Sequence, residues 1–423
     1  MKDVKIFPGF LKGEVKVPPS KSLCHRAIIA ASLAQGQSVV DNVVLSEDIL
    51  ATIQGVQALG AEVIFQQNKL VINGCQLAAP NNCIIDCNES GSTLRFLIPL
   101  GLRTENIITY RGVGNLGNRP LDPYLEIFKE QDILYSNDKL PISVSGILKP
   151  GTFNIKGNIS SQFVTGLMFA LPLLDGDSTI FISGPLESKG YIDLTIDILS
   201  SFGIFILNNN YQSFFIKGRQ EYKPRKYTVE GDYSQAAFWL AAGVLGSDIS
   251  CLELKQSSKQ GDKFIINILK SAGAEFEMQD AYLKALPTEL QAFKIDVSQY
   301  PDLAPILTVV AALSKGTSRI TGAGRLRMKE CDRLRAITAE LNKLGAVILE
   351  ENDSLTVRGS ASLAGGHVDS WGDHRIAMAL AIAATKCSEP VIIHNSKAVN
   401  KSYPNFFEDY NKLGGNLHEW NLG

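Results

Sequence analysis

The stretch that decides the fold is Thr52–Gly74, TIQGVQALGAEVIFQQNKLVING. It begins with apolar residues at helical spacing, passes through Gly60, and continues as two β-branched, apolar runs on either side of the polar pair Gln67 and Asn68. A glycine commonly ends a helix, and two such runs around a short polar turn are typical of a β-hairpin. The stretch therefore predicts the end of a helix followed by a hairpin.

The same pattern returns five more times along the chain. The steps between the equivalent positions are 71, 72, 70, 72 and 69 residues, and the last copy is truncated. The positions are Gly60, Gln131, Gly203, Gly273, Gly345 and Gly414. Self-similarity at a fixed period is the signature of a repeated structural unit. The sequence therefore predicts six copies of a unit of about 70 residues.

Each copy also contains an earlier helix rich in Ala, Leu and Gly, followed by a β-branched strand. Because these helices are apolar on nearly all faces, we expect them to be buried, with the more amphipathic helix of each copy facing solvent. They begin near Ser22, Ser92, Ser161, Tyr233, Asp302 and Asp373. Alternating strands and helices that end in hairpins predict a mixed α/β fold.

Six copies in 423 residues divide naturally into two domains of three. We place the division near Arg219–Asp232, RQEYKPRKYTVEGD, a charged connector that contains a proline. The second predicted domain therefore begins near residue 231.

Composition excludes several functional classes. The chain is 45% hydrophobic, and its 41 basic and 43 acidic residues leave a formal charge of −2. Such a balance provides no global basic field for nucleic acid or an anionic membrane, so we expect neither as a partner. Seven cysteines without a Cys-x-x-Cys pair suit a reducing compartment, and no apolar run is long enough for a membrane helix. We therefore expect a cytoplasmic protein.

Polar and charged residues gather where the predicted buried helices begin. The first of these places is Val15–Arg26, VKVPPSKSLCHR, in which two prolines, two serines and two cations precede the run AIIAASLA. Free N–H groups and the positive end of the helix dipole make such places anion sites, so converging helix starts would bind a polyanion. Six ordinary N-caps are the alternative. They explain Ser and Asp, but a cation in the first turn, as at Arg375, opposes the dipole.

A second group of cations lies in Gly322–Ala336, GAGRLRMKECDRLRA, which ordinary solvent exposure could also explain. The segment Gly112–Gly117, GVGNLG, matches a dinucleotide fingerprint, but Asn118, Arg119 and Pro120 follow it. The fingerprint must lead into a helix, so we expect a turn. The five histidines lack metal-ligand spacing, and we expect no metal and no cofactor.

At this point the motifs form a recognisable set. In order, they are PPSKSLCHR, the Gly-Ser-Thr-Leu-Arg turn, SSQF, SKGYID, YPDLAP, RMKECDRLR, GDHRIAM and NKSYP. Across essentially the whole chain they resemble the 5-enolpyruvylshikimate-3-phosphate synthase family. The resemblance implies a two-lobed, inside-out α/β barrel in which each lobe has three βαβαββ units. It also implies that residues 1–14 join 231–423, that the active site lies in the cleft between the lobes, and that the lobes open and close. We expect a monomer.

The resemblance implies transfer of a carboxyvinyl group from phosphoenolpyruvate to the 5-hydroxyl of shikimate 3-phosphate, with release of phosphate. The lobe 15–230 would bind mainly shikimate 3-phosphate, and the other would carry the acid and base. The implied catalytic residues are Asp302, Glu330 and Lys21. The implied shikimate 3-phosphate ligands are Lys21, Ser22, Arg26, Ser160, Ser161, Gln162, Ser188, Tyr191, Asp302, Arg325 and Lys329. The implied phosphoenolpyruvate ligands are Lys21, Gly91, Arg119, Gln162, Arg333, Arg375 and Lys401.

The sequence departs from the family pattern at Glu89, Ser92, Phe96 and Arg325. These departures bear on the affinity for the substrates and on the sensitivity to inhibitors that mimic phosphoenolpyruvate. The nearest alternative is UDP-N-acetylglucosamine enolpyruvyl transferase, which typically carries a reactive cysteine before its Arg-Pro. Here Arg111–Pro120, RGVGNLGNRP, has none. RNA 3'-phosphate cyclases share the repeat, but no nucleotide motif is present. A non-catalytic phosphosugar-binding homologue has little use for carboxylates in its cleft.

Overall fold

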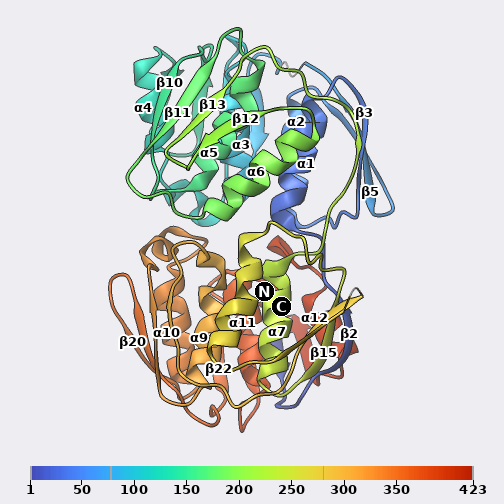
Figure 1. The fold of residues 1–423 in the computed structure, drawn as a ribbon, viewed down its shortest axis with the longest axis vertical. Coiled ribbons are helices and arrows are strands. Elements are labelled where there is room, and N and C mark those ends of the chain that lie inside the picture. Colours follow the sequence, from blue (N-terminus) through green and yellow to red (C-terminus); the bar gives the residue numbers. More distant parts are fainter. Residues whose placement is uncertain (1, 77–78, 280, 422–423) are drawn as a thin grey trace. The chain divides into compact units, whose positions relative to one another are not determined.

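The structure is a computed structural model that describes residues 2–76, 79–279 and 281–421. Its contacts divide the chain into two compact units (Figure 1). One is Pro19–Val229, the 19–229 unit, and the other joins the segment that ends at Pro18 to the segment that begins at Glu230. We call the latter the 230–421 unit, and it includes residues 2–18. The divisions lie four residues and one residue from those expected at 14/15 and 230/231.

Over the residues that the structure describes, each unit contains three four-stranded sheets. In spatial order, those of the 19–229 unit are β14 (Lys226–Thr228), β3 (Gly36–Asp41), β5 (Lys69–Gly74) and β4 (Glu62–Gln66); β6 (Cys83–Asp86), β7 (Ile108–Arg111), β9 (Ile142–Ser145) and β8 (Leu134–Tyr135); and β10 (Thr152–Lys156), β11 (Ser178–Ser183), β13 (Ser213–Ile216) and β12 (Ile206–Asn209).

The sheets of the 230–421 unit have the same arrangement. In spatial order, they are β2 (Lys12–Lys16), β15 (Asp248–Leu252), β17 (Tyr282–Ala285) and β16 (Phe276–Met278); β18 (Lys294–Asp296), β19 (Thr317–Thr321), β21 (Leu355–Arg358) and β20 (Val347–Glu350); and β22 (Gly366–Asp369), β23 (Val391–His394), β1 (Lys2–Ile6) and β24 (Leu417–Asn421). The six sheets confirm the predicted mixed α/β fold of six repeats.

The first two strands of each sheet are parallel and the others are antiparallel. Parallel neighbours need a crossover, and in most repeats the buried helix provides it. These helices are α1 (Lys21–Leu33), α3 (Gly91–Gly101), α5 (Ser161–Ala170), α7 (Tyr233–Val244), α9 (Ala304–Ala312) and α11 (His374–Ala384). Every residue of α7, α9 and α11 is buried. The predicted burial is therefore confirmed.

The second helix of each repeat precedes its hairpin, as predicted. These helices are α2 (Glu47–Ala58), α4 (Asp122–Glu130), α6 (Lys189–Ser201), α8 (Ile265–Ser271), α10 (Arg333–Lys343) and α12 (Phe406–Lys412). The 3₁₀ helices are η1 (Gly114–Asn118), η2 (Leu171–Leu173), η3 (Gly261–Phe264), η4 (Pro301–Leu303), η5 (Gly324–Met328) and η6 (Ser396–Lys401). The 112–117 segment thus leads into a 3₁₀ turn, as expected, and not directly into an α-helix.

Two strands are exchanged between repeats. Strand β2 precedes α1 in sequence but pairs with β15 of the 230–421 unit, whereas β14 precedes α7 but pairs with β3 of the 19–229 unit. The segment 219–232, which we predicted as a connector, therefore contains the strand β14. The truncated sixth copy also has an explanation, because β1 from the start of the chain pairs with both β23 and β24 and completes its sheet. Among the described residues, no helix is long and apolar enough to cross a membrane.

Candidate active site

The starts of the buried helices converge within the 19–229 unit. Ser90 caps α3, accepting a hydrogen bond at Oγ from the amide of Thr93 (3.1 Å), and Ser160 caps α5, accepting one from the amide of Gln162 (3.3 Å). The side chain of Gln162 also donates to Oγ of Ser92 at 3.0 Å, which joins the start of α5 to that of α3. The predicted ligands Ser160, Ser161 and Gln162 thus lie at a helix start that adjoins the start of α3, where Gly91 lies, and the side chain of Gln162 reaches Gly91.

Gly91 is surrounded by polar groups. A Cβ at this position would lie 2.8 Å from Nη1 of Arg119 and 3.3 Å from Oε1 of Gln162. Arg95, to which we assigned no role, donates through Nη1 to the same Oε1 at 2.6 Å and lies over the ring of Phe163. Glycine is needed where groups approach the backbone this closely. The turn therefore brings two buried guanidinium groups to one helix start.

Arg26 is held by neutral groups. Its guanidinium donates to Oγ1 of Thr195 (2.8 Å) and to the backbone carbonyls of Ser22 (2.8 Å) and Tyr191 (3.1 Å). Burial lowers the pKa of Arg26 to about 10. The structure thus brings together three predicted ligands, Ser22, Arg26 and Tyr191, and places buried Ser188, in the left-handed conformation (φ 57°), immediately before α6.

Lys21 has a partner that the sequence analysis did not identify. Its Nζ forms an ion pair with Oδ2 of Asp48 at 2.7 Å. Asp48 lies in the first turn of α2, after the N-cap Ser46, where an acidic residue is ordinary. Sequence alone offered no reason to select it, because Lys21 and Asp48 meet only when α1 packs on α2.

His25 was also missed. Its Nδ1 lies 2.7 Å from Oγ1 of Thr52, which lies 2.6 Å from Oγ1 of Thr93, and Thr93 donates to Oγ of Ser90 at 2.8 Å. Burial, helped by the charges of Lys21 and Arg26, lowers the pKa of His25 well below 6.5. The chain of hydroxyls joins neutral His25 on α1 to the cap of α3.

In the 230–421 unit, most of the predicted residues form one ion cluster around Arg333 and Asp302. Nη1 of Arg333 contacts Oδ1 of Asp302 (2.8 Å), its Nη2 contacts Oε2 of Glu330 (2.6 Å), and its Nε contacts Oδ2 of Asp373 (2.7 Å). Although burial alone would lower it, the carboxylates of Asp373, Glu330 and Asp302 raise the pKa of Arg333 well above its ordinary value. Asp373, to which we assigned no ligand role, caps α11.

Asp302 contacts two further cations. Nζ of Lys329 lies 3.4 Å from Oδ1, and Nη2 of Arg375 lies 3.2 Å from Oδ2. Burial lowers the pKa of Lys329 despite the nearby charge of Asp302. Lys401 donates to the carbonyl of Gly372, beside the cap of α11, at 2.8 Å. The predicted residues of this unit therefore cluster where α9 and α11 begin.

Comparison with known proteins identifies this architecture. The sequence model of the family EPSP synthase (3-phosphoshikimate 1-carboxyvinyltransferase) matches residues 7–410. The chain belongs to the EPSP synthase family. It is 56% identical to the 3-phosphoshikimate 1-carboxyvinyltransferase of Clostridium perfringens (strain ATCC 13124), covering 99% of both chains, and 50% identical to that of Clostridioides difficile (strain 630), covering 100% of both. An EPSP synthase structure from Acinetobacter baumannii aligns with a TM-score of 0.83 at 24% identity, covering 100% of both chains, and confirms the fold.

The four residues at which the sequence departs from the family pattern each make a hydrogen bond or a packing contact in this structure. Glu89 accepts a hydrogen bond from the amide of Asn115 at 3.3 Å, which holds its carboxylate at the 114–118 turn. Ser92 accepts from Gln162, and the buried ring of Phe96 lies 5.2 Å from the guanidinium carbon of Arg26. Arg325 donates to the carbonyl of Ser298 at 3.0 Å. Each departure is thus accommodated within its own unit.

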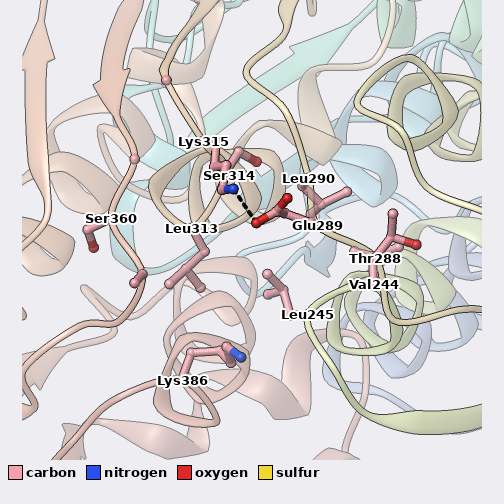
Figure 2. Close-up of a pocket in the computed structure, with 13 residues that line it drawn as sticks. Val244, Leu245, Thr288, Glu289, Leu290, Leu313, Ser314, Lys315, Ser360 and Lys386 are labelled. Atoms are coloured by element: carbon pink, nitrogen blue, oxygen red, sulfur yellow. Dashed lines mark ion pairs between the residues drawn. The ribbon is translucent and has the colours of Figure 1, made fainter.

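A pocket drawn in Figure 2 lies at the other end of the buried helices in the 230–421 unit. Its volume is about 490 Å³, and Val244, Leu313 and Lys386 line it where α7, α9 and α11 end. Helix C-termini carry the negative end of the dipole and disfavour a polyanion. No predicted site residue lines this pocket. Among the described residues, no group of three or more His, Cys, Asp and Glu side chains is placed to hold a metal ion.

Proposed function

We propose that this chain transfers the carboxyvinyl group of phosphoenolpyruvate to the 5-hydroxyl of shikimate 3-phosphate and releases phosphate. The observation that carries the proposal is the ion cluster in which one buried Arg333 holds the carboxylates of Asp302 and Glu330. The activity shared by the full-length relatives supports the same reaction. A member of this family that only bound anions would have little use for two such carboxylates.

Binding is assigned to the helix starts of the 19–229 unit together with cations of the other unit. The set Ser22, Arg26, Ser160, Ser161, Gln162, Ser188 and Tyr191 would hold shikimate 3-phosphate, joined by Asp302, Arg325 and Lys329. The set Lys21, Gly91, Arg119, Gln162, Arg333, Arg375 and Lys401 would hold phosphoenolpyruvate. Buried cations and free helix N–H groups favour ligands with several negative charges.

The reaction needs an acid and a base. In the addition step, Asp302 takes the proton of the 5-hydroxyl as its oxygen attacks C2 of phosphoenolpyruvate, and a proton is added at the methylene carbon. In the elimination step, that carbon loses a proton, the C2–O bond to phosphate breaks, and the double bond returns. Glu330 is assigned to the methylene carbon, with Lys21 as a further acid, and positioned cations stabilise the departing phosphate.

The proposed ligands are distributed over both units, so we propose that substrate binding brings the two sets together and excludes water. Lys21 belongs to one unit and Glu330 to the other, and their meeting in the cleft between the lobes is part of this proposal. The monomeric state, the cytoplasmic location and the absence of a metal or cofactor stay predictions.

A paired phosphate-release assay tests the function. Purified protein is mixed with phosphoenolpyruvate and either shikimate 3-phosphate or UDP-N-acetylglucosamine, and inorganic phosphate is measured. We expect release only with shikimate 3-phosphate. Release only with UDP-N-acetylglucosamine would assign the chain to the sister reaction, and no release with either would support the binding homologue.

Variants of Asp302 test the mechanism. Asp302→Ala should retain binding of shikimate 3-phosphate, measured by calorimetry, but lose at least about a hundredfold in kcat because the general base is absent. Glu408→Ala, which removes an exposed carboxylate of α12 in the same unit, is the control and should keep full activity. Unimpaired turnover by Asp302→Ala would remove Asp302 from the mechanism.

A further inference from the structure

A second buried carboxylate lies close to the proposed base. Asp262, in the 3₁₀ helix η3, is 4% exposed, and Oγ of Ser234 donates a hydrogen bond to its Oδ2. Ser234 lies in the first turn of α7, where its amide donates to the cap residue Asp232 at 2.8 Å. Asp262 is therefore held at the start of α7, the first buried helix of the unit in sequence.

Packing joins η3 to the 3₁₀ turn η4 that carries Asp302. The rings of Phe264 in η3 and Tyr300, the cap of η4, stack with centroids 4.6 Å apart and planes 12° apart. The charges of Asp302 and Arg375 both act on the carboxyl group of Asp262. Arg375 also contacts Oδ2 and the backbone carbonyl of Asp302 at 3.2 Å. The two aspartates therefore share the field of one arginine.

The charges around Asp302 raise a chemical question. A carboxylate in contact with cations is stabilised as the anion and becomes a weaker base. Asp302 contacts three cations, Lys329, Arg333 and Arg375. Glu330 and Asp373 are ion-paired with Arg333 and offset its charge. Asp262 provides a negative charge in the field of Arg375.

We propose that Asp262 is a positioning residue for the transferase reaction, whose carboxylate, held by Ser234, offsets the charge of Arg375 and preserves the ability of Asp302 to accept the substrate hydroxyl proton. The proposal rests on the proposed function above and extends it to a residue that belongs to neither of the assigned sets of ligands. Asp262 acts through Asp302 and Arg375, not on the substrate.

The effect of Asp262 depends on pH. Burial and the charge of Asp302 raise its pKa from 3.8 to about 6, although Arg375 and the hydrogen bond from Ser234 oppose the rise. The charged and titratable groups that face it are Asp232 at the start of α7, Asp302 and Tyr300 at η4, and Arg375 on α11. Below about pH 6 Asp262 is neutral and its help to Asp302 is lost. The rate should therefore fall in acid through this group.

The pH dependence of kcat tests the proposal. Wild-type enzyme should show an acidic limb near pH 6. Asp262→Asn should remove that limb and lower kcat at pH 7.5 about tenfold, with KM values within about twofold. Ser234→Ala keeps the charge but loses the hydrogen bond that lowers the pKa, so its limb should move to higher pH. An unchanged limb in both variants would overturn the proposal, since a purely structural role would leave the profile in place.

A titration independent of activity separates this inference from the proposed function. The carboxyl carbons of ¹³C-labelled aspartate are followed by NMR, and the signal missing from Asp262→Asn identifies Asp262. Replacing the charge of the neighbour in Asp302→Asn should lower the midpoint of Asp262 by about one pH unit, because two like charges raise each other's pKa. If the wild-type protein releases phosphate but the midpoint of Asp262 is the same in wild type and Asp302→Asn, the inference is overturned. If the midpoint shifts but the wild-type protein releases no phosphate, the proposed function is overturned instead.

Discussion

The two units begin their buried helices in the same way but surround those beginnings with different groups. In the 19–229 unit, cations are held largely by hydroxyl, amide and carbonyl oxygens, as at Arg26 and Arg95. In the 230–421 unit, the cations nearest Asp302 are held by carboxylates, as at Arg333. Cations with neutral partners keep their charge available for anionic ligands. Carboxylates among cations are suited to accept and release protons.

Two of the most deeply buried arginines, Arg26 and Arg333, show the contrast in the direction of their pKa shifts. Burial lowers the pKa of Arg26 to about 10, whereas the carboxylates around Arg333 overcome burial and raise its pKa well above the ordinary value. The same side chain at equal burial therefore responds in opposite directions. The charges of the neighbouring side chains, and not the extent of burial, therefore decide the direction of each pKa shift.

Removal of each arginine should show the largest difference between the units. Arg333→Met leaves three carboxylates without their shared cation and should lower the free energy of unfolding by about 3–5 kcal/mol. Arg26→Met leaves only neutral acceptors without a donor and should cost about 1–3 kcal/mol. Urea unfolding at pH 7.5 measures both.

The probes for this comparison are already present in the chain. All three tryptophans, Trp239, Trp371 and Trp420, lie in the 230–421 unit, so their fluorescence reports on Arg333→Met and circular dichroism reports on both variants. Arg335→Met, an exposed position on the same helix as Arg333, is the control and should change stability by less than about 0.5 kcal/mol. An equal cost for the two buried arginines would contradict the comparison.

Stability should depend on pH with opposite sign in the two units. The pKa of His25 in the folded protein lies well below 6.5, so the unfolded chain binds a proton at this group at a higher pH than the folded protein does. The free energy of unfolding should therefore fall as the pH falls below 6.5. Because the folded pKa of Asp262 is raised from 3.8 to about 6, stability instead falls as the pH rises through this interval, by up to about 3 kcal/mol.

Thermal melts of two variants measure these opposite trends. His25→Gln should flatten the acid-side loss in the 19–229 unit, followed by circular dichroism. Asp262→Asn should flatten the loss between pH 4 and 6 in the 230–421 unit, followed by tryptophan fluorescence. Trends of the same sign in the two wild-type transitions would show that these two groups do not control the pH dependence.

Gly91→Ala tests whether the cation Arg119 of the 19–229 unit binds phosphoenolpyruvate. The added Cβ would lie 2.8 Å from Nη1 of Arg119, which is the end of a flexible side chain and can move. We therefore expect little change in stability but about a tenfold rise in KM for phosphoenolpyruvate, because displacing one charged ligand costs about 1.4 kcal/mol or more. Steady-state kinetics measure the KM, and Gly117→Ala, at an open position nearby in sequence, is the control. An unchanged KM would remove Arg119 from that site.

Asp48→Asn should have the smallest effect. Asp48 is a carboxylate of the 19–229 unit that pairs with a predicted catalytic cation, Lys21. Without this partner Lys21 should lose its fixed position, and we expect kcat to fall about fivefold while the Kd for shikimate 3-phosphate changes less than about threefold. Kinetics and calorimetry measure the two quantities, with Asp138→Asn, an exposed loop position, as the control. A larger change in Kd than in kcat would assign Asp48 to binding instead.

Three residues near the candidate site could not be predicted from the sequence, and the reason is the same for each. Asp48, His25 and Asp262 each occupy an ordinary position in a helix or turn, and their significance comes from partners 27 or 28 residues away, Lys21, Thr52 and Ser234. The hydrogen bonds exist because helices of one repeat pack together, which no local pattern records. Asp302, Glu330 and Arg333 were accessible because they belong to motifs.

The sequence by itself determined the repeat, its helices and hairpins, and the polar residues at the helix starts, because glycines, hydrophobic periodicity and caps act over a few residues. Only the tertiary structure decided that β1 completes the last sheet, that β2 and β14 are exchanged, and that one arginine joins three carboxylates. Strand pairing and ion pairing depend on which groups meet in space. The order of residues along the chain identifies these groups but does not say which of them come into contact.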